Sequence, residues 1–238
     1  MRKWYKGPMT DDDDITPLDQ LLSTAVFSGQ RNEVLTLLAL GASPVWKDAQ
    51  GTTALHYAAE RDDAGILADL LSSPKAAADV RDDDNATPLH FAARKGRQDS
   101  IRLLLAKNAA VNAQDKWGAG ALFRAAHNGQ TVAVELLLKN GATVNLPDNK
   151  GHTALLAAVQ RVHLLTAYAL VRAGADANLA NDNGLSPLDL ATRLGQNVQN
   201  QFELTQFLTA VKLQGELVNG ATKAIRPIKT VSFKKPGA

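Results

Sequence analysis

The 238-residue chain contains no cysteine. This absence excludes a disulfide framework, a thiolate nucleophile and any zinc or iron–sulfur site that needs cysteine ligands. Aromatic residues are also scarce, at 5% of the chain, which leaves few side chains on which the bases of a nucleic acid could stack. Several classes of redox enzyme, metalloprotein and nucleic-acid binder are therefore excluded or disfavoured at the outset.

Long hydrophobic runs are missing as well. No stretch approaches the roughly 18 consecutive apolar residues that a membrane-spanning helix needs. The basic start, Met1 to Lys6, is followed by Gly7 to Asp14 without the apolar segment of a signal peptide. We therefore expect a soluble, cytoplasmic protein with no membrane span, while export by a route without a classical signal peptide stays open.

The chain also lacks a strong excess of either charge sign. It holds 26 Lys+Arg against 24 Asp+Glu, a formal net charge of +2. This balance argues against nucleic acid as the default partner, because binding to phosphates needs clustered positive charge. The hydrophobic fraction of 45% is ordinary for a globular protein, so full-length disorder is not expected.

The dominant positive feature is an internal repeat with a period of 33 residues, lengthened once to 34. One column of the repeat holds Leu22, Leu55, Leu89, Leu122, Leu155 and Leu188. A second column holds Gly29, Asp62, Gly96, Gly129, Val162 and Gly195 with the same steps. The agreement of independent columns predicts a stack of similar units.

Each unit has the pattern of two short helices followed by a turn-rich link. In the third unit, Thr87 suits an N-cap, and Pro88 suits the first helical position, where a missing N–H costs nothing. The apolar triplet Ile101, Leu104 and Leu105 has the i, i+3, i+4 spacing of a second helix. Gly, Asn and Asp follow and predict a loop before the next unit.

These units resemble the ankyrin repeat family. The segment from Thr87 to Gly96, the Leu104-Leu105 pair and Ala110-Val111-Asn112 carry the resemblance, and the other units hold counterparts. The resemblance implies an all-α repeat solenoid of stacked helix–turn–helix units with β-hairpin-like fingers projecting from one end. It also implies a concave face built from the fingers and the first helices.

We expect the array to occupy residues 15–213. A charged lead-in over residues 1–14 is expected to be flexible, and a basic tail over residues 214–238 is expected to be extended or disordered. The expected units lie near residues 15–47, 48–81, 82–114, 115–147, 148–180 and 181–213.

Some units depart from the pattern. The first lacks a Thr-Pro start at its aligned position, which holds Gln20-Leu21. The second has Asp62 and Pro74 where glycine is usual, and the fifth has Val162 in place of a glycine, which predicts a re-registered helical turn. In the sixth, the apolar triplet comes late, at residues 204–208, and predicts an atypical capping helix.

A search for catalytic and ligand-binding motifs finds no phosphate loop, zinc-protease helix or nucleophile elbow. His56 and His90 share one column, and the resemblance implies that their rings bond locally within the unit. Asp82 to Asp84 and Asp11 to Asp14 lack the ligand pattern of a calcium loop and are expected to be solvated. We therefore expect no catalytic residue, no cofactor and no metal ion, and we predict that the protein is not an enzyme.

The resemblance implies partner contacts where the repeat framework leaves side chains free, in the fingers and at the ends of the first helices. Trp117 lies at a finger tip, where its own unit cannot bury it, and an exposed Trp is typical of interface anchors. The ends of the first helices carry basic residues in several units, and stacking of the units would align these residues as a basic stripe. The alternative is that they only solvate an exposed face. The stripe comprises Arg61, Arg94, Lys95, Arg161 and Arg193, with Arg124 nearby. The predicted partner-binding residues are Arg61, Asp83, Asp84, Arg94, Lys95, Lys116, Trp117, Arg124, His127, Asn128, Lys150, His152, Arg161 and Arg193.

These observations predict a monomeric, non-catalytic scaffold that binds another protein through the concave groove. The partner is expected to present acidic and apolar side chains, although the fold does not identify it. The alternative is a nucleic-acid or anionic-surface binder that uses the basic stripe and the C-terminal tail. Salt dependence separates the two, because contacts to phosphates weaken steeply with ionic strength.

Overall fold

The computed structural model describes residues 17–194 together with residues 203, 205, 206, 208 and 209. The lead-in expected over residues 1–14, the tail expected over 214–238 and much of the capping helix expected near 204–211 lie outside the described residues. Within that last region, Leu208 is fully buried, and the Thr205 hydroxyl donates a 2.8 Å hydrogen bond to the carbonyl of Ala191.

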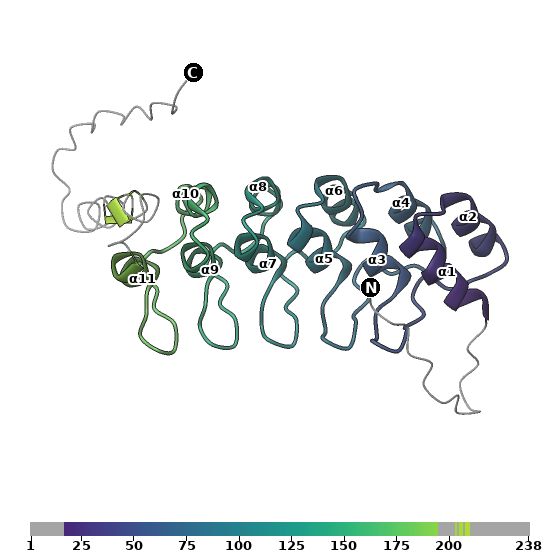
Figure 1. Cartoon of the computed structure of the whole chain (residues 1–238), viewed down its shortest axis with the longest axis horizontal. Helices are drawn as coiled ribbons and strands as arrows, with labels where there is room; N and C mark the ends of the chain where they lie inside the picture. The colour runs from purple at the N-terminus through teal and green to yellow at the C-terminus, as the bar shows by residue number, and fades with distance from the viewer. Residues whose placement is uncertain (1–16, 195–202, 204, 207, 210–238) are drawn as a thin grey trace, which may run out of the picture.

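The described residues form two rows of helices along an elongated array (Figure 1). The inner row comprises α1 (Pro17–Ser28), α3 (Ala54–Ala59), α5 (Pro88–Lys95), α7 (Ala121–His127), α9 (Ala154–Gln160) and α11 (Pro187–Leu194). The outer row comprises α2 (Arg31–Ala39), α4 (Gly65–Leu71), α6 (Gln98–Ala106), α8 (Thr131–Lys139) and α10 (Leu164–Arg172). The predicted all-α repeat solenoid is confirmed.

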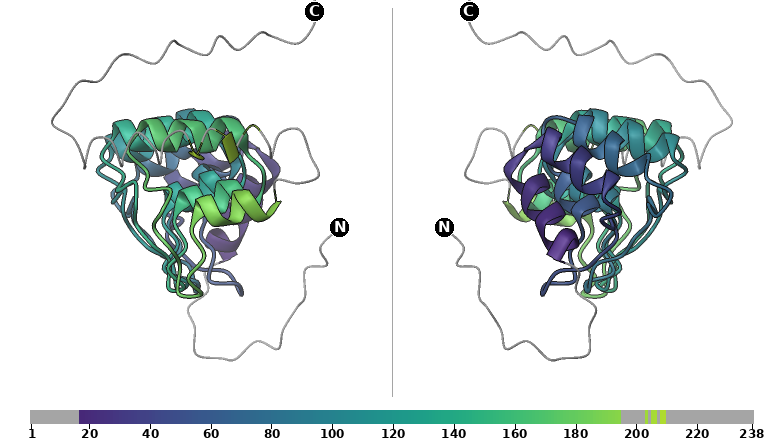
Figure 2. Two further views of the ribbon diagram at one scale, coloured as in Figure 1. Left: turned by 90° about the vertical axis from the view of Figure 1, so that its left-hand side faces the viewer. Right: turned by 90° about the vertical axis from the view of Figure 1, so that its right-hand side faces the viewer.

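Loops between successive units project together from one side of the inner row and form the fingers, as Figure 2 shows along the long axis. Isolated antiparallel bridges join Lys47 to Thr53 and Gln114 to Gly120. These bridges give the fingers the hairpin-like form that the sequence predicts. Each inner helix packs against the inner helix of the next unit, so the fingers are held in a row.

Capping residues set where the inner helices begin. Thr53 and Thr87 hold extended backbone immediately before α3 and α5, and each forms a reciprocal capping box with the histidine three residues later. In the first unit, the aligned position holds Gln20-Leu21, and both residues lie inside helix α1. Helix α1 is described from Pro17, ahead of that aligned position.

The core is a continuous column of apolar side chains between the two rows. The leucine column of the repeat is buried in every unit, and so are alanine pairs such as Ala92-Ala93 and Ala125-Ala126. Small side chains at these positions let neighbouring inner helices approach closely, and each unit buries its apolar face only against its neighbours. None of the described helices has the length and apolarity to cross a membrane.

Val162 occupies a left-handed backbone conformation, with φ +58°, close to the +69° of Gly129 in the preceding unit. The outer helix α10 begins two residues after Val162, just as α8 begins two residues after Gly129. The predicted re-registration is therefore wrong. Hydrogen bonds from Val162 N–H to Val159 (3.0 Å) and from His163 N–H to Ala158 (2.9 Å) close the helix end and impose this conformation on a β-branched residue.

Replacing Val162 with glycine is expected to stabilise the protein by about 0.5–1 kcal/mol. Left-handed backbone costs an L-residue about 1–2 kcal/mol, and the greater entropy of unfolded glycine offsets about half of the relief. Urea unfolding measures the change. Val162→Ala keeps the unfavourable φ and is expected to give no such gain; a Val162→Gly variant less stable than the wild type would contradict the prediction.

Candidate partner-binding surface

Each finger is built around the side chain of its first polar residue. In the third unit, Asp82 Oδ1 accepts hydrogen bonds from the N–H groups of Asp84 (2.9 Å) and Ala86 (2.8 Å). In the fourth, Asp115 Oδ1 does the same for Trp117 (2.9 Å) and Ala119 (3.0 Å). These buried carboxylates fix the turn, so the next residues of each finger are presented outward.

Backbone hydrogen bonds then link the finger tips of neighbouring units. Lys116 N–H donates to the carbonyl of Asp84 (2.8 Å), and Asn149 N–H donates to that of Trp117 (2.9 Å). Asp182 N–H donates in the same way to the carbonyl of Lys150 (3.1 Å). The tips of the third to sixth units therefore form one connected edge with a fixed spacing.

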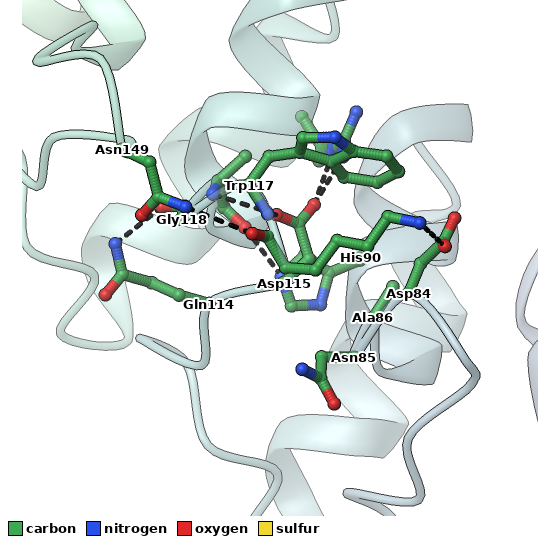
Figure 3. Close-up of polar contacts among 12 residues, drawn as sticks. Asp84, Asn85, Ala86, His90, Gln114, Asp115, Trp117, Gly118 and Asn149 are labelled. Atoms are coloured by element: carbon green, nitrogen blue, oxygen red, sulfur yellow. Dashed lines mark hydrogen bonds and ion pairs between the residues drawn. The ribbon is translucent and has the colours of Figure 1, made fainter.

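Trp117 lies on this edge with 49% of its surface exposed. The Lys116 ammonium lies 4.5 Å from the centre of the indole ring, and the Arg124 guanidinium carbon lies 5.3 Å from it. Both cations are themselves held by carboxylates, Lys116 by Asp84 and Arg124 by Asp115 (Figure 3). The indole is thus a large, half-exposed surface whose orientation is fixed by two cation–π contacts.

Two residues of the predicted basic stripe are engaged by their neighbours. Arg94 forms an ion pair with Glu60 of the preceding unit, and its guanidinium lies 4.9 Å from the ring centre of Phe91. Arg61 Nη1 donates a 2.9 Å hydrogen bond to the carbonyl of Phe27 near the end of α1. These cations join adjacent units. Glu60 occupies the same column as Arg94, one unit earlier, and the ion pair between the two was not predicted from the sequence.

Four basic residues among the predicted partner contacts lie at the surface, and no described carboxylate forms an ion pair with them. Lys95, Lys150, Arg161 and Arg193 are exposed. Among the described residues, no Asp or Glu oxygen lies within 4.0 Å of their charged groups. Arg161 does have a neutral partner, because its Nε–H donates a 3.1 Å hydrogen bond to His127 Nε2.

The polar and acidic residues of the predicted partner-binding set differ in how far their side chains are exposed. His127 is half-buried and stacks on Phe123 at 6.2 Å; burial first, and then Arg161 and Arg124, lower its pKa. His152 is half-buried and hydrogen-bonded through Nδ1 to Asp148 Oδ2 (3.0 Å).

Asn128 is exposed, and its side-chain amide donates a hydrogen bond to the carbonyl of Arg124 (2.8 Å). Asp83, also exposed, forms a 3.3 Å ion pair with Lys47.

His56 and His90 lie inside the units, away from this surface. His90 Nδ1 accepts from the N–H of Thr87 (3.1 Å), and His90 Nε2 lies 3.0 Å from the carbonyl of Ala119 in the next unit. Because a carbonyl can only accept, Nε2 carries the proton and the ring is neutral. Burial lowers the pKa of both histidines. The hydrogen bonds expected within the unit for this histidine column are confirmed. Each ring also forms a hydrogen bond to a carbonyl of the next unit.

Within the described part of the chain, no three His, Asp or Glu side chains converge as metal ligands would. Tyr57 is another residue that the sequence did not single out: its hydroxyl donates a 2.5 Å hydrogen bond to Asp48 Oδ2, and burial, followed by this bond, raises its pKa. Its ring contacts Phe27 edge-on at 5.9 Å.

Comparisons with known proteins agree with this architecture. Among curated proteins, the chain is 37% identical over 89 residues to the B-cell lymphoma 3 protein homolog of Mus musculus, covering 36% of this chain and 20% of that protein. It is 40% identical over 70 residues to neurogenic locus notch homolog protein 4 of Homo sapiens, covering 29% and 4%. Protein PhlB of Serratia liquefaciens is 42% identical over 82 residues, covering 34% and 36%. The chain thus spans only a minor part of these curated relatives.

A solved structure matches over more of the chain. The crystal structure of the ankyrin repeat domain of Bcl-3, described as a unique member of the IkappaB protein family, superposes with a TM-score of 0.66 at 33% identity. The match covers 78% of this chain and 81% of that one. A family model for ankyrin repeats in three copies matches residues 22–115 and again residues 122–210. The chain therefore belongs to the ankyrin repeat family.

Proposed function

We propose that this array is a non-catalytic scaffold that binds a partner protein on its concave surface around Trp117. The observation that carries the proposal is the half-exposed indole, held in place by Lys116 and Arg124 at the connected finger edge. A large aromatic side chain with a fixed orientation loses little entropy on binding and is a frequent energetic centre of interfaces. Ankyrin repeat domains among the relatives support protein binding as the general role.

The remaining predicted contact residues surround this anchor on the fingers and at the inner helix ends. The partner is expected to offer an apolar group to Trp117 and carboxylates to the exposed cations. Nucleic-acid binding has less support, because Arg94, Lys116 and Arg124 are already neutralised by carboxylates of the protein itself. A phosphate backbone would have to displace these intramolecular pairs.

Trp117→Ala is expected to weaken partner binding about 30-fold, because truncating a central anchor typically costs about 2 kcal/mol or more. Affinity capture with crosslinking from the native cell identifies the partner, and titration with it measures the change. Leu165→Ala is the matched control, because Leu165 is 74% exposed but lies on α10 in the outer row. Unchanged affinity for Trp117→Ala, or an equal loss for Leu165→Ala, would place the binding surface elsewhere.

A further inference from the structure

The cations of the concave surface divide into two groups along the array. In the first half, ion pairs connect consecutive units: Glu60 binds Arg94, and Asp84 binds Lys116. Each carboxylate comes from the unit that precedes its cation, so these ion pairs bridge neighbouring units. Their intramolecular neutralisation leaves them little capacity to attract an acidic partner.

From the end of α5 onward, this pairing stops at the ends of the inner helices. The two residues before each helix-ending position are Arg94 and Lys95, then His127 and Asn128, then Gln160 and Arg161, then Arg193 and Leu194. After the third unit, none of these positions holds a carboxylate. Lys95, Arg161 and Arg193 therefore present positive charge that no described carboxylate neutralises. Asp182, at the exposed sixth finger tip, bounds this surface on the finger side.

The spacing of the inner helices sets the distances between these cations. Helices α5, α7, α9 and α11 follow one another along the inner row (Figure 1), and packed helices lie about 8–10 Å apart. Lys95 and Arg161 occupy the same column two units apart, and Arg193 lies one unit further, in the neighbouring column one position earlier. A ligand that meets all three must therefore carry negative groups about 16–20 Å apart and then about 8–10 Å apart.

One backbone conformation of a peptide matches this spacing. A polyproline II helix has three residues per turn and advances about 3.1 Å per residue, so every third side chain lies on one face about 9 Å further along. Carboxylates at the first, seventh and tenth positions of such a segment would meet Lys95, Arg161 and Arg193. The fourth position would fall at the unit of Trp117, where an apolar side chain fits.

We propose that the surface from α5 to α11 binds an extended, polyproline II-like acidic segment of a partner protein, with carboxylates opposite Lys95, Arg161 and Arg193 and one apolar side chain beside Trp117. This inference rests on the proposed function, because it names the class of segment that the protein-binding surface takes. Such a segment is preorganised in solution, so its binding loses less entropy than the binding of a flexible chain.

Two synthetic peptides of equal composition test the spacing. The matched peptide reads Glu-Pro-Pro-Leu-Pro-Pro-Glu-Pro-Pro-Glu, and the clustered peptide reads Glu-Glu-Glu-Pro-Pro-Leu-Pro-Pro-Pro-Pro. Fluorescence anisotropy of labelled peptides with the full chain is expected to show about tenfold tighter binding of the matched peptide. Equal binding of the two peptides, or binding of neither, overturns the inference, while partner capture that depends on Trp117 would still support the proposed function.

Charge reversal tests the residues. Lys95→Glu/Arg161→Glu/Arg193→Glu is expected to abolish the preference for the matched peptide. The control Arg102→Glu/Lys107→Glu/Lys139→Glu reverses three exposed cations, one in the outer helix α6, one directly after α6 and one at the end of α8, and is expected to retain the preference. Equal losses in both variants overturn the proposal. So does tighter, steeply salt-dependent binding of a ten-nucleotide oligothymidine, which would assign the surface to nucleic acid. Circular dichroism verifies that both variants stay folded.

Discussion

His90→Ala is expected to lower the free energy of unfolding by about 3–4 kcal/mol. The imidazole bonds to the N–H and hydroxyl of Thr87 and to the carbonyl of Ala119, and all of these groups are buried. Without the ring, the Thr87 N–H and the Ala119 carbonyl remain buried without these partners, at about 1–3 kcal/mol each. The missing ring also leaves a cavity, because His90 is buried. Urea unfolding followed by circular dichroism measures the loss.

The bond to Ala119 makes His90 a link between the third and fourth units. In a repeat array, weakening one interface reduces the coupling of the units on either side. We therefore expect His90→Ala to broaden the unfolding transition or divide it in two. His152→Ala is the control, because His152 bonds only within its own finger, to Asp148. If the two alanine variants are equally stable, the histidine column does not join the units.

The repeat could be predicted from the sequence because its chemistry is local and recurs. Thr87, Pro88 and Gly96 specify the start and end of α5 without any distant contact, and the leucine column marks the buried face. Val162 shows where this reasoning fails. The sequence indicates that a valine at position 162 disfavours a left-handed backbone conformation. Only the packed structure shows that the hydrogen bonds at the end of α9 outweigh the cost of that conformation.

The candidate site could be predicted only in part. The exposure of Trp117 follows from its place at a finger tip. The pairing of the cations does not follow from their columns, because it depends on how successive units are offset. Asp84 and Lys116 occupy different finger positions yet form an ion pair, since neighbouring tips are shifted by one residue where Lys116 N–H bonds to the Asp84 carbonyl.

The stability of the array is expected to fall as the pH is lowered below about 6.5. Burial lowers the folded-state pKa of His56 and His90, so both rings are neutral in the folded protein while the unfolded chain takes up protons near its ordinary value of 6.5. Their stabilising contribution is complete above pH 6.5 and is lost as the pH falls toward the lower folded-state pKa. Each ring contributes a slope of up to about 1.4 kcal/mol per pH unit, so the pair contributes a slope of up to about 2.7 kcal/mol per pH unit.

Urea unfolding at pH 7.5, 6.5 and 5.5 measures this slope. His56→Leu is the control, because the fifth unit already holds Leu156 in the same column, fully packed. The variant is expected to be less stable at pH 7.5 but to lose the part of the pH dependence that His56 contributes, while His90 keeps its own part. Titration of carboxylates acts on both proteins alike and cancels in the difference. An identical slope in the two proteins would mean that His56 accepts a proton in the folded state as readily as in the unfolded chain, which its hydrogen bonds to Thr53 and Ala86 oppose.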